Sequence, residues 1–593
     1  MDKFIDELGL EVAFMPSPRP EKSQPPLPVP DPATLTLRKG SVNAEGAFPL
    51  LCDILFERDV TIALRDGSEV FGDVFRPVGE EGVPAILAYT HYGKRAGHGP
   101  WNANPPVRAF GATADQFSGL DSFEAPDPGY WVAHGYAVVN VDAVGTGYSD
   151  GEHAVFPGTK SGRDIYDVVE WIAQQGWCNG KVGMNGNSYL AANQWAAAAQ
   201  QPPHLAAIAP WEGLSDFYRD TVFRGGIRNT GAFWADAIHA TLFGQGLVED
   251  AVGENADRYP FFNAYWADKV ADFSKITIPA YVAASWTNPL HTPGTIRAYR
   301  ELGSTEKWLR VHNSFEWLDI ADQDSRDDLR KFFDRYLKGL ENGWEDTPRV
   351  RLSILDQGGT DVVGRAESEW PLARQTWRSL ALDATSGSLV DGAVAQEAAL
   401  TYVGDDLGDS VEFSIEAIEE LEINGYMKLH LWIEAAEADD ADIFAAVYKK
   451  SADGTVLHHF TITDPGVRTF AETQVTDGVI DLPFAWAGPN GCIRASHRAL
   501  DPARSTESEP VLLHQSEELL EPGVAVPVEL SLWPSAFVVH PGEHLVVKIA
   551  GHPVGSVSTA GTPDPNMPTR NRGEYRIRTG GAFDSHLLLP VVS

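Results

Sequence analysis

Residues 183–192, which read Gly-Met-Asn-Gly-Asn-Ser-Tyr-Leu-Ala-Ala, constrain the fold more than any other stretch of the chain. The residues from Lys181 onward predict a short buried strand, and the alanine-rich run up to Ala199 predicts a helix. A strand, a sharp turn carrying Ser188 and a helix form the layout of a nucleophile elbow. Gly186 lies two residues before the serine, where a larger side chain would collide with the turn. The stretch therefore predicts Ser188 as a nucleophile at the edge of a parallel sheet.

The first 347 residues alternate between apolar runs and helical patterns. Helical spacing of apolar residues appears at 162–175 and 326–338, and apolar runs appear at 85–90, 136–142, 205–210, 280–286 and 308–311. Strands that are apolar throughout and alternate with helices favour a parallel sheet covered on both faces. Such sheets bind ligands beyond the carboxyl ends of their strands. We therefore expect the loops after the strands at 85–90, 183–184, 280–286 and 308–311 to converge.

A chain of 593 residues is too long for one hydrophobic core. The pattern of apolar, aromatic and turn residues also changes several times along it. Between 215 and 274 no strand-like apolar runs occur and aromatic residues are frequent, which predicts a mostly helical cap. We expect these aromatic side chains chiefly to form the core of the cap. After about residue 348 short alternating runs separated by turn residues predict a jelly-roll β-sandwich. The predicted domains are an extended N-terminal arm at 1–50, an α/β-hydrolase core at 51–214 and 275–347, the cap at 215–274 and the β-sandwich at 348–593.

Charge and cysteine content exclude several classes of function. The formal net charge of −37 opposes binding to nucleic acid or to anionic membranes. The three cysteines, Cys52, Cys178 and Cys492, lie far apart and match neither a disulfide framework nor zinc spacing. The N-terminal residues lack the pattern of a signal peptide, and no apolar run is long enough to span a membrane. We expect a cytoplasmic protein that uses no metal and no organic cofactor.

A serine hydroxyl needs a neighbouring base, and the base must come from a loop at the same edge of the sheet. His312 directly follows the predicted strand at 308–311 and is the favoured candidate. His291 lies five residues beyond Trp286, where the preceding strand ends, and is the alternative.

The base needs an acceptor that orients its ring, and the sequence leaves the identity of this group open. The position after the strand ending at Trp286 offers Asn288 and no carboxylate. An amide oxygen can accept the imidazole N–H, although in a serine protease the change from Asp to Asn costs about 10⁴ in rate. The carboxylates that could replace Asn288 in this role are Glu212, Glu316 and Asp319.

The oxyanion of an acyl-transfer reaction needs two hydrogen-bond donors. One is the backbone amide of Tyr189, directly after the serine. In α/β-hydrolases the other donor comes from a loop like the one after the strand at 85–90. Tyr92 lies in this loop and can donate through its phenol.

Several segments together resemble the family of cocaine esterase and X-prolyl dipeptidyl aminopeptidase, serine α/β-hydrolases with a helical cap and a C-terminal jelly roll. The segments that carry the resemblance are 136–142 with Gly145, Gly147, Ser149 and Gly151, then 170–183, Gly186-x-Ser188-Tyr189, 490–498 and 579–586. The resemblance implies Ser188 as nucleophile, His312 as base, and Tyr92 with the Tyr189 amide as oxyanion hole. It also implies that a homodimer can form. The chain departs from the family pattern at Asn288, where an Asp is usual, and also at Val144 and Ala191.

These observations predict a serine hydrolase that cleaves carboxylic esters, or activated amides, through an acyl-enzyme. The cap would select the acyl group, which its aromatics predict to be apolar. One alternative is an aminopeptidase that releases X-Pro dipeptides and holds the substrate ammonium with cap carboxylates, for which Asp216, Asp220, Asp236 and Glu249 are the candidates. A second alternative is a non-catalytic binding protein whose triad is degraded at Asn288.

Overall fold

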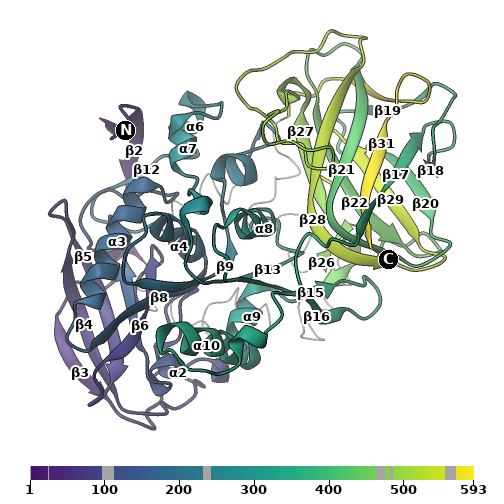
Figure 1. The fold of residues 1–593 in the computed structure, drawn as a ribbon. Coiled ribbons are helices and arrows are strands. Elements are labelled where there is room, and N and C mark those ends of the chain that lie inside the picture. The colour runs from purple at the N-terminus through teal and green to yellow at the C-terminus, as the bar shows by residue number, and fades with distance from the viewer. Residues whose placement is uncertain are drawn as a thin grey trace.

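The computed structural model describes residues 2–23, 26–95, 112–230, 242–461, 475–476, 479–480, 485–554 and 569–592. Two large bodies lie side by side: a sheet flanked by helices, and a domain built almost entirely of strands (Figure 1). The first is an α/β-hydrolase core and the second a β-sandwich, as the sequence predicts.

The hydrolase sheet has eleven strands and a parallel centre. Parallel pairing joins the seven strands from β7 to β15, while β3–β4–β5 and β16 pair antiparallel at the two ends. In spatial order the strands are β3 (Ala33–Leu37), β4 (Ile54–Ala63), β5 (Glu69–Pro77), β7 (Ala137–Asp142), β6 (Val83–Thr90), β8 (Cys178–Ser188), β9 (Leu205–Gly213), β13 (Ala280–Ser285), β14 (Lys307–His312), β15 (Val350–Ile354) and β16 (Val362–Glu367).

Helices cover both faces of this sheet, which is why its central strands are apolar throughout. Leu87 of β6 packs in one core cluster and its neighbour Ile86 in another, because successive side chains point to opposite faces. Helices α3 (Thr159–Ala173), α4 (Tyr189–Ala199) and α8 (Thr292–Glu301) contribute to the first cluster. Helices α2 (Pro128–Ala133) and α10 (Gln323–Leu337) contribute to the second. Across the described residues, no helix has both the length and the apolar character that crossing a membrane requires.

The β15 strand belongs to the hydrolase sheet, although the sequence places it in the sandwich. It pairs parallel with β14 and antiparallel with β16. The predicted boundary at residue 348 therefore precedes two strands of the hydrolase sheet. Alternating strands look the same in sequence whichever sheet they join, because pairing partners are set by tertiary contacts.

The N-terminal arm and the cap are more strand-rich than the sequence predicts. Residues 1–50 include β1 (Asp2–Ile5), β2 (Glu11–Pro16) and β3, and β2 pairs with β12 (Leu247–Glu249) of the cap. Where the cap is described, its regular elements are short. They are the π-helical turn Tyr218–Val222, the hairpin of β10 (Phe223–Arg224) and β11 (Ile227–Arg228), β12, α6 (Glu254–Arg258), α7 (Ala264–Asp268) and the 3-10 turn Phe273–Lys275. Phe217, Tyr218 and Trp266 pack in one buried cluster, so these cap aromatics form its own core.

The second domain is a sandwich of mostly antiparallel strands. Its main strands are β17 (Gln375–Asp383), β18 (Ser388–Asp391), β19 (Ala398–Val403), β20 (Val411–Glu416), β21 (Leu421–Ala435), β22 (Asp442–Lys450), β27 (Asn490–Arg494), β28 (Val526–Val539), β29 (His544–Ala550), β30 (Glu574–Thr579) and β31 (His586–Val592). The sandwich packs against the hydrolase core through β28, which contacts α8 and β15.

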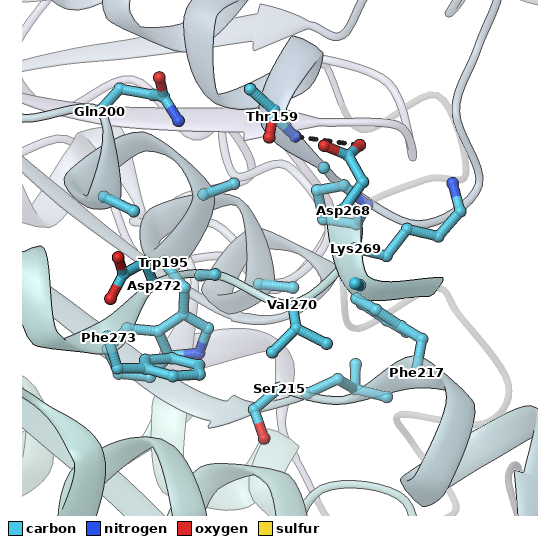
Figure 2. A pocket seen from close by; sticks show the side chains of 18 of the residues that line it. Thr159, Trp195, Gln200, Ser215, Phe217, Asp268, Lys269, Val270, Asp272 and Phe273 are labelled. Carbon is cyan, nitrogen blue, oxygen red and sulfur yellow. Dashed lines mark hydrogen bonds between the residues drawn. The ribbon is translucent and has the colours of Figure 1, made fainter. Parts of the chain in front are cut away.

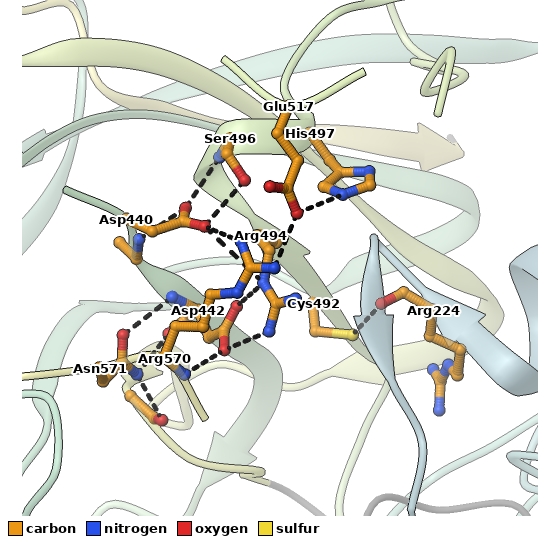
Figure 3. A network of polar contacts seen from close by, with 12 residues as sticks. Arg224, Asp440, Asp442, Cys492, Arg494, Ser496, His497, Glu517, Arg570 and Asn571 are labelled. Atoms are coloured by element: carbon orange, nitrogen blue, oxygen red, sulfur yellow. Dashed lines mark hydrogen bonds and ion pairs between the residues drawn. The ribbon is translucent and has the colours of Figure 1, made fainter. Parts of the chain in front are cut away.

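A buried polar network ties the sandwich to the cap (Figure 3). Arg494 of β27 forms a bidentate ion pair with Asp442 of β22, at 2.7 and 2.9 Å. Asp440 accepts hydrogen bonds from the amide and hydroxyl of Ser496. The Arg494 amide donates to the carbonyl of Gly225 in the β10–β11 hairpin. The segment at 490–498, one of those that carry the family resemblance, therefore has a structural role.

Replacing Arg494 with Met is expected to lower the free energy of unfolding by about 3–5 kcal/mol, because it leaves the buried Asp442 carboxylate without its partner. Denaturant titration measures the loss. The matched control is Arg374→Met, because Arg374 pairs with Glu367 while 46% of its side chain is exposed. Exposed pairs contribute about 0–1 kcal/mol. Equal losses in the two variants would contradict a structural role for the network.

Candidate active site

Ser188 ends β8 and is the residue directly before α4, at a strained turn. Its φ of 57° and ψ of −119° lie in a region that L-residues rarely adopt. Gly186 has φ of 143°, and a Cβ there would lie 2.7 Å from Leu190 Cβ and 2.9 Å from the carbonyl oxygen of Glu124. The turn therefore requires glycine two residues before the serine, as the sequence pattern predicts.

Gly186→Ala is expected to lower the melting temperature and to reduce turnover by about 100-fold or more, because small displacements of a reacting group are that costly. Gly176→Ala is the matched control, since a Cβ at Gly176 meets no atom within 4 Å and its φ is ordinary. Thermal unfolding and steady-state kinetics of both variants provide the test. A Gly186→Ala enzyme as active as the control would show that the turn tolerates a side chain.

Helix α4 is buried along its length, and polar side chains fix it against the sheet. Gln194 donates to the carbonyl of Gly186 at 3.3 Å and accepts from the amide of Ala209 at 3.0 Å. Asn193 donates to the carbonyl of Tyr89 at 2.9 Å. These bonds tie the helix to β8, β9 and β6, so the strained elbow is held from three strands.

His291 is the histidine that contacts Ser188. Its Nε2 lies 3.1 Å from Ser188 Oγ. It is the residue directly before α8, in the loop after β13, and is buried. This distance is the reach that proton transfer from a serine hydroxyl to a base requires.

The structure does not bring His312, the favoured base, to Ser188. His312 ends β14 as expected, but its Nε2 lies 2.9 Å from Glu212 Oε1 and 3.9 Å from Asp319 Oδ2. No contact between His312 and Ser188 is present within the described part of the chain. Burial lowers the pKa of His312, but the charges of Asp319 and Glu212 raise it above its ordinary value. The Nε2 of His312 thus faces Glu212 and Asp319 and not Ser188.

Asn288 lies beside His291 but faces it with its amide nitrogen. The side-chain oxygen of Asn288 accepts from the backbone amides of Leu290 at 3.1 Å and His291 at 3.2 Å. This leaves Nδ2 toward His291 Nδ1, at 2.9 Å. An amide nitrogen is a donor only, so Asn288 as placed does not accept an imidazole N–H.

Glu316, the first residue of α9 (Glu316–Ala321), places a carboxylate beside His291 Nδ1. Its Oε2 lies 2.9 Å from His291 Nδ1. A proton on Nδ1, on the side of this carboxylate, would leave the Nε2 lone pair for the serine hydroxyl. Burial lowers the pKa of His291, but the charge and hydrogen bond of Glu316 raise it above its ordinary value. The other two carboxylate candidates serve elsewhere: Glu212 faces His312, and Asp319 pairs with Arg310 at 2.6 Å.

Both predicted oxyanion donors lie at the serine. The phenol of Tyr92 is buried and interacts with the side chains of Ser188 and Glu124. Burial and the charge of Glu124 raise the pKa of Tyr92 well above its usual range, so the phenol keeps its proton and can donate. The amide of Tyr189 is the first N–H of α4 and has no acceptor within the helix.

Glu124 is a site residue that the sequence analysis missed. It is buried at φ of 61°, its carbonyl accepts from the Asn187 amide at 3.2 Å, and its Oε1 accepts from Trp317 Nε1 at 3.0 Å. Burial and the neighbouring charge of Glu316 raise the pKa of Glu124 to about 8. No motif marks it, because it lies in an irregular loop far from the elbow in sequence.

A cavity of about 270 Å³ lies between α4 and the cap (Figure 2). Trp195, Phe217, Val270 and Phe273 form an apolar lining, and the Thr159 amide donates to Asp268 at its rim, at 3.4 Å. Ser188, His291 and Glu316 are not among the lining residues. The cavity is therefore separate from the reacting groups.

The described cap carboxylates that could hold a substrate ammonium already have cationic partners. Asp216 pairs with Arg219 at 2.9 Å, Asp220 with Arg297 at 2.6 Å, and Glu249 with Lys269 at 2.8 Å. Asp236, the fourth candidate, lies outside the described residues.

Comparison with known proteins gives relatives for both domains. Residues 66–314 match the model of the X-Pro dipeptidyl-peptidase (S15 family), and residues 342–588 match the X-Pro dipeptidyl-peptidase C-terminal non-catalytic domain. Cocaine esterase from Rhodococcus sp. (strain MB1 Bresler) is 26% identical over 53% of this chain and 60% of its own. A putative serine esterase from Mycobacterium bovis is 35% identical over 28% of this chain and 26% of its own. The chain thus spans less than two thirds of these relatives.

Solved structures extend the likeness to nearly the whole chain. A CocE/NonD family hydrolase from Staphylococcus aureus superposes with a TM-score of 0.81 at 31% identity, over 91% of this chain and 94% of that one. An α-amino acid ester hydrolase superposes with a TM-score of 0.64 at 17% identity, over 91% of this chain and 96% of that one, and shows the common fold. On the two matched domains and this coverage, the chain belongs to the CocE/NonD family of hydrolases, with the catalytic and C-terminal domains of the X-Pro dipeptidyl-peptidase S15 family.

Proposed function

We propose that the protein is a serine esterase whose triad is Ser188, His291 and Glu316. The observation that carries the proposal is the 3.1 Å contact between His291 Nε2 and Ser188 Oγ at a strained elbow. Glu316 orients the ring of His291, and Tyr92 with the Tyr189 amide holds the oxyanion. The base is thus His291, the alternative from the sequence, in place of His312.

The reaction follows from these positions. Ser188 Oγ attacks the ester carbonyl while its proton passes to His291 Nε2, and the carbonyl oxygen becomes an oxyanion held by Tyr92 and the Tyr189 amide. Collapse of this intermediate breaks the ester bond, and His291 returns the proton to the leaving alkoxide. Water, deprotonated by His291, then attacks the acyl-enzyme, and the acid leaves as Ser188 regains its proton. No step needs a metal or organic cofactor.

Esters are favoured over X-Pro peptides by the pairing of the cap carboxylates. Each described candidate is neutralised by an arginine or lysine, so capture of a substrate ammonium would first require breaking an ion pair. Aryl acetate hydrolysis is expected to exceed hydrolysis of an Ala-Pro anilide. A faster rate on the anilide would favour the peptidase. Labelling of Ser188 by a fluorophosphonate separates both enzymes from the non-catalytic binding protein, which would not react.

The pH profile of kcat/KM is expected to show an acidic limb above pH 6.5. The neutral form of His291 is the active base, so activity falls as pH drops through the pKa of this residue. Burial lowers this pKa, but Glu316 raises it above 6.5, which moves the limb upward. A rate that is flat from about pH 5 to 8 would contradict the assignment of a histidine base.

Glu124→Gln separates the limb of His291 from titration of Glu124, because the pKa of Glu124 is about 8. The acidic limb is expected to persist in this variant with little shift, since a Glu124 whose pKa is about 8 is already largely protonated where His291 titrates. Loss of the limb would assign it to Glu124 instead.

The proposed setting is the cytoplasm, with a small-molecule ester as the partner of the site. The supporting observations are three free cysteines and a net charge of −37, which disfavours nucleic acid and anionic membranes. A homodimer, which the family resemblance implies, would appear by light scattering at twice the chain mass.

A further inference from the structure

A second cavity, of about 170 Å³, lies where the cap, α8 and the β-sandwich meet. The cap contributes Arg219 and Arg224, α8 contributes Arg297, and the sandwich contributes Trp533 and Arg504. The acidic residues in its lining are Asp220 and Glu529. Ser188, His291, Glu316 and Tyr92 are not among its lining residues, so the cavity is separate from the proposed catalytic site.

Most charges around this cavity are neutralised within the protein. Arg297 forms a bidentate pair with Asp220 at 2.6 and 2.7 Å. Arg219 pairs with Asp216 at 2.9 Å. Glu529 contacts Lys428 at 3.0 Å. These pairs leave the guanidinium groups of Arg224 and Arg504, for which no carboxylate lies within ion-pair distance in the described part of the chain.

Of these two arginines without a carboxylate partner, Arg224 is the unusual one because it is buried. Only 8% of its surface is exposed, and its Nη1 has no hydrogen-bond partner among the described residues. Its guanidinium carbon lies 5.6 Å from the centre of the Trp533 ring, and its carbonyl oxygen accepts from Cys492 Sγ at 3.4 Å. Figure 3 shows its guanidinium directed away from the network around Asp442 and Arg494. A buried arginine without a carboxylate is costly unless an anion accompanies it.

We propose that this cavity binds a small oxyanion, with Arg224 as its principal ligand and Arg504 as a secondary one at the rim. Arginine presents donors in a planar fork that matches carboxylate and phosphate oxygens. A water molecule occupies about 30 Å³ of liquid, so a cavity of about 170 Å³ admits a phosphate or a short carboxylate together with bridging waters. The chemical class is thus a small phosphate or carboxylate. The protein as a whole is strongly acidic, so a cavity with surplus positive charge is a specific feature and not a consequence of composition.

The test is calorimetric titration of the full-length protein with inorganic phosphate and, separately, with acetate, at constant ionic strength and fixed chloride. Saturable binding of one anion per chain is expected. Arg224→Gln is expected to weaken it by about tenfold or more, the loss of a charge-assisted bidentate contact. The preferred anion identifies the class of ligand. Tighter binding of phosphate indicates a ligand with a phosphoryl group, and tighter binding of acetate indicates a carboxylate.

Two further variants keep the result interpretable. Arg504 is exposed, so the Arg504→Gln variant should fold normally. Its binding of the anion should be weaker by about threefold. Arg374→Gln, which removes an equally charged but distant side chain, should leave binding unchanged. Esterase turnover in anion-free buffer reports folding of each variant. Absence of saturable binding to the wild type, or equal binding by the Arg224 and Arg374 variants, would overturn the proposal.

Discussion

His291→Ala is expected to lower kcat on an aryl ester by about 10⁴–10⁶-fold, as much as Ser188→Ala, because nucleophile and base act as one unit. Without an acceptor at 3.1 Å, the Ser188 hydroxyl has no group to take its proton. The double variant should be no slower than either single one, since removing the second member of a unit costs nothing further. Steady-state kinetics with active-site titration would measure all three.

His312 provides the decisive comparison. His312→Gln removes a ring that faces Glu212 and not the serine. We expect turnover per folded active site to fall by less than about tenfold, while stability decreases because the buried Glu212 loses its counter-ion. A folded His312→Gln enzyme without turnover, together with an active His291→Ala enzyme, would return the base to His312 and reject the proposed triad.

The second large effect is expected from Glu316→Gln. This change removes the carboxylate that lies 2.9 Å from His291 Nδ1, and turnover should fall by about 10³–10⁴-fold, as when the orienting Asp of a serine protease becomes Asn. The acidic limb of the pH profile should also move downward, since Glu316 is the charge that raises the pKa of His291. A purely structural role for Glu316 would not move this limb.

Asn288→Asp offers a rescue that isolates the orienting role. One oxygen of the new carboxylate would keep the bonds to the backbone amides of Leu290 and His291, and the other would replace Nδ2 at His291 Nδ1. Alone, Asn288→Asp should change turnover little, because Glu316 already orients the ring. Combined with Glu316→Gln, it should recover activity at least tenfold. Failure of the double variant to recover any activity would show that Glu316 acts by some means other than accepting from Nδ1.

Much of the fold follows from local sequence rules. The alternation of apolar runs with helical patterns predicts the parallel sheet, because such strands need cover on both faces. The elbow is predictable for a similar reason: the turn around Ser188 admits only glycine at position 186. The β15 strand shows the limit of these rules. Its residues predict a strand, but whether it joins the hydrolase sheet or the sandwich depends on partners far away in the chain.

In the candidate site, too, some residues follow from the sequence and others only from the tertiary structure. Ser188, Tyr92 and the Tyr189 amide are fixed by the ends of β6 and β8, so their meeting follows from the order of strands in the sheet. The sequence by itself thus determined the fold class, and it predicted the nucleophile and the oxyanion donors of the proposed site. Only the tertiary structure shows that His291 and not His312 contacts Ser188, that Glu316 lies beside His291 Nδ1, and that Glu124 is part of the site. These residues lie in loops, where no repeating backbone geometry fixes the direction of a side chain, and a rotation about one bond determines which group a ring nitrogen reaches.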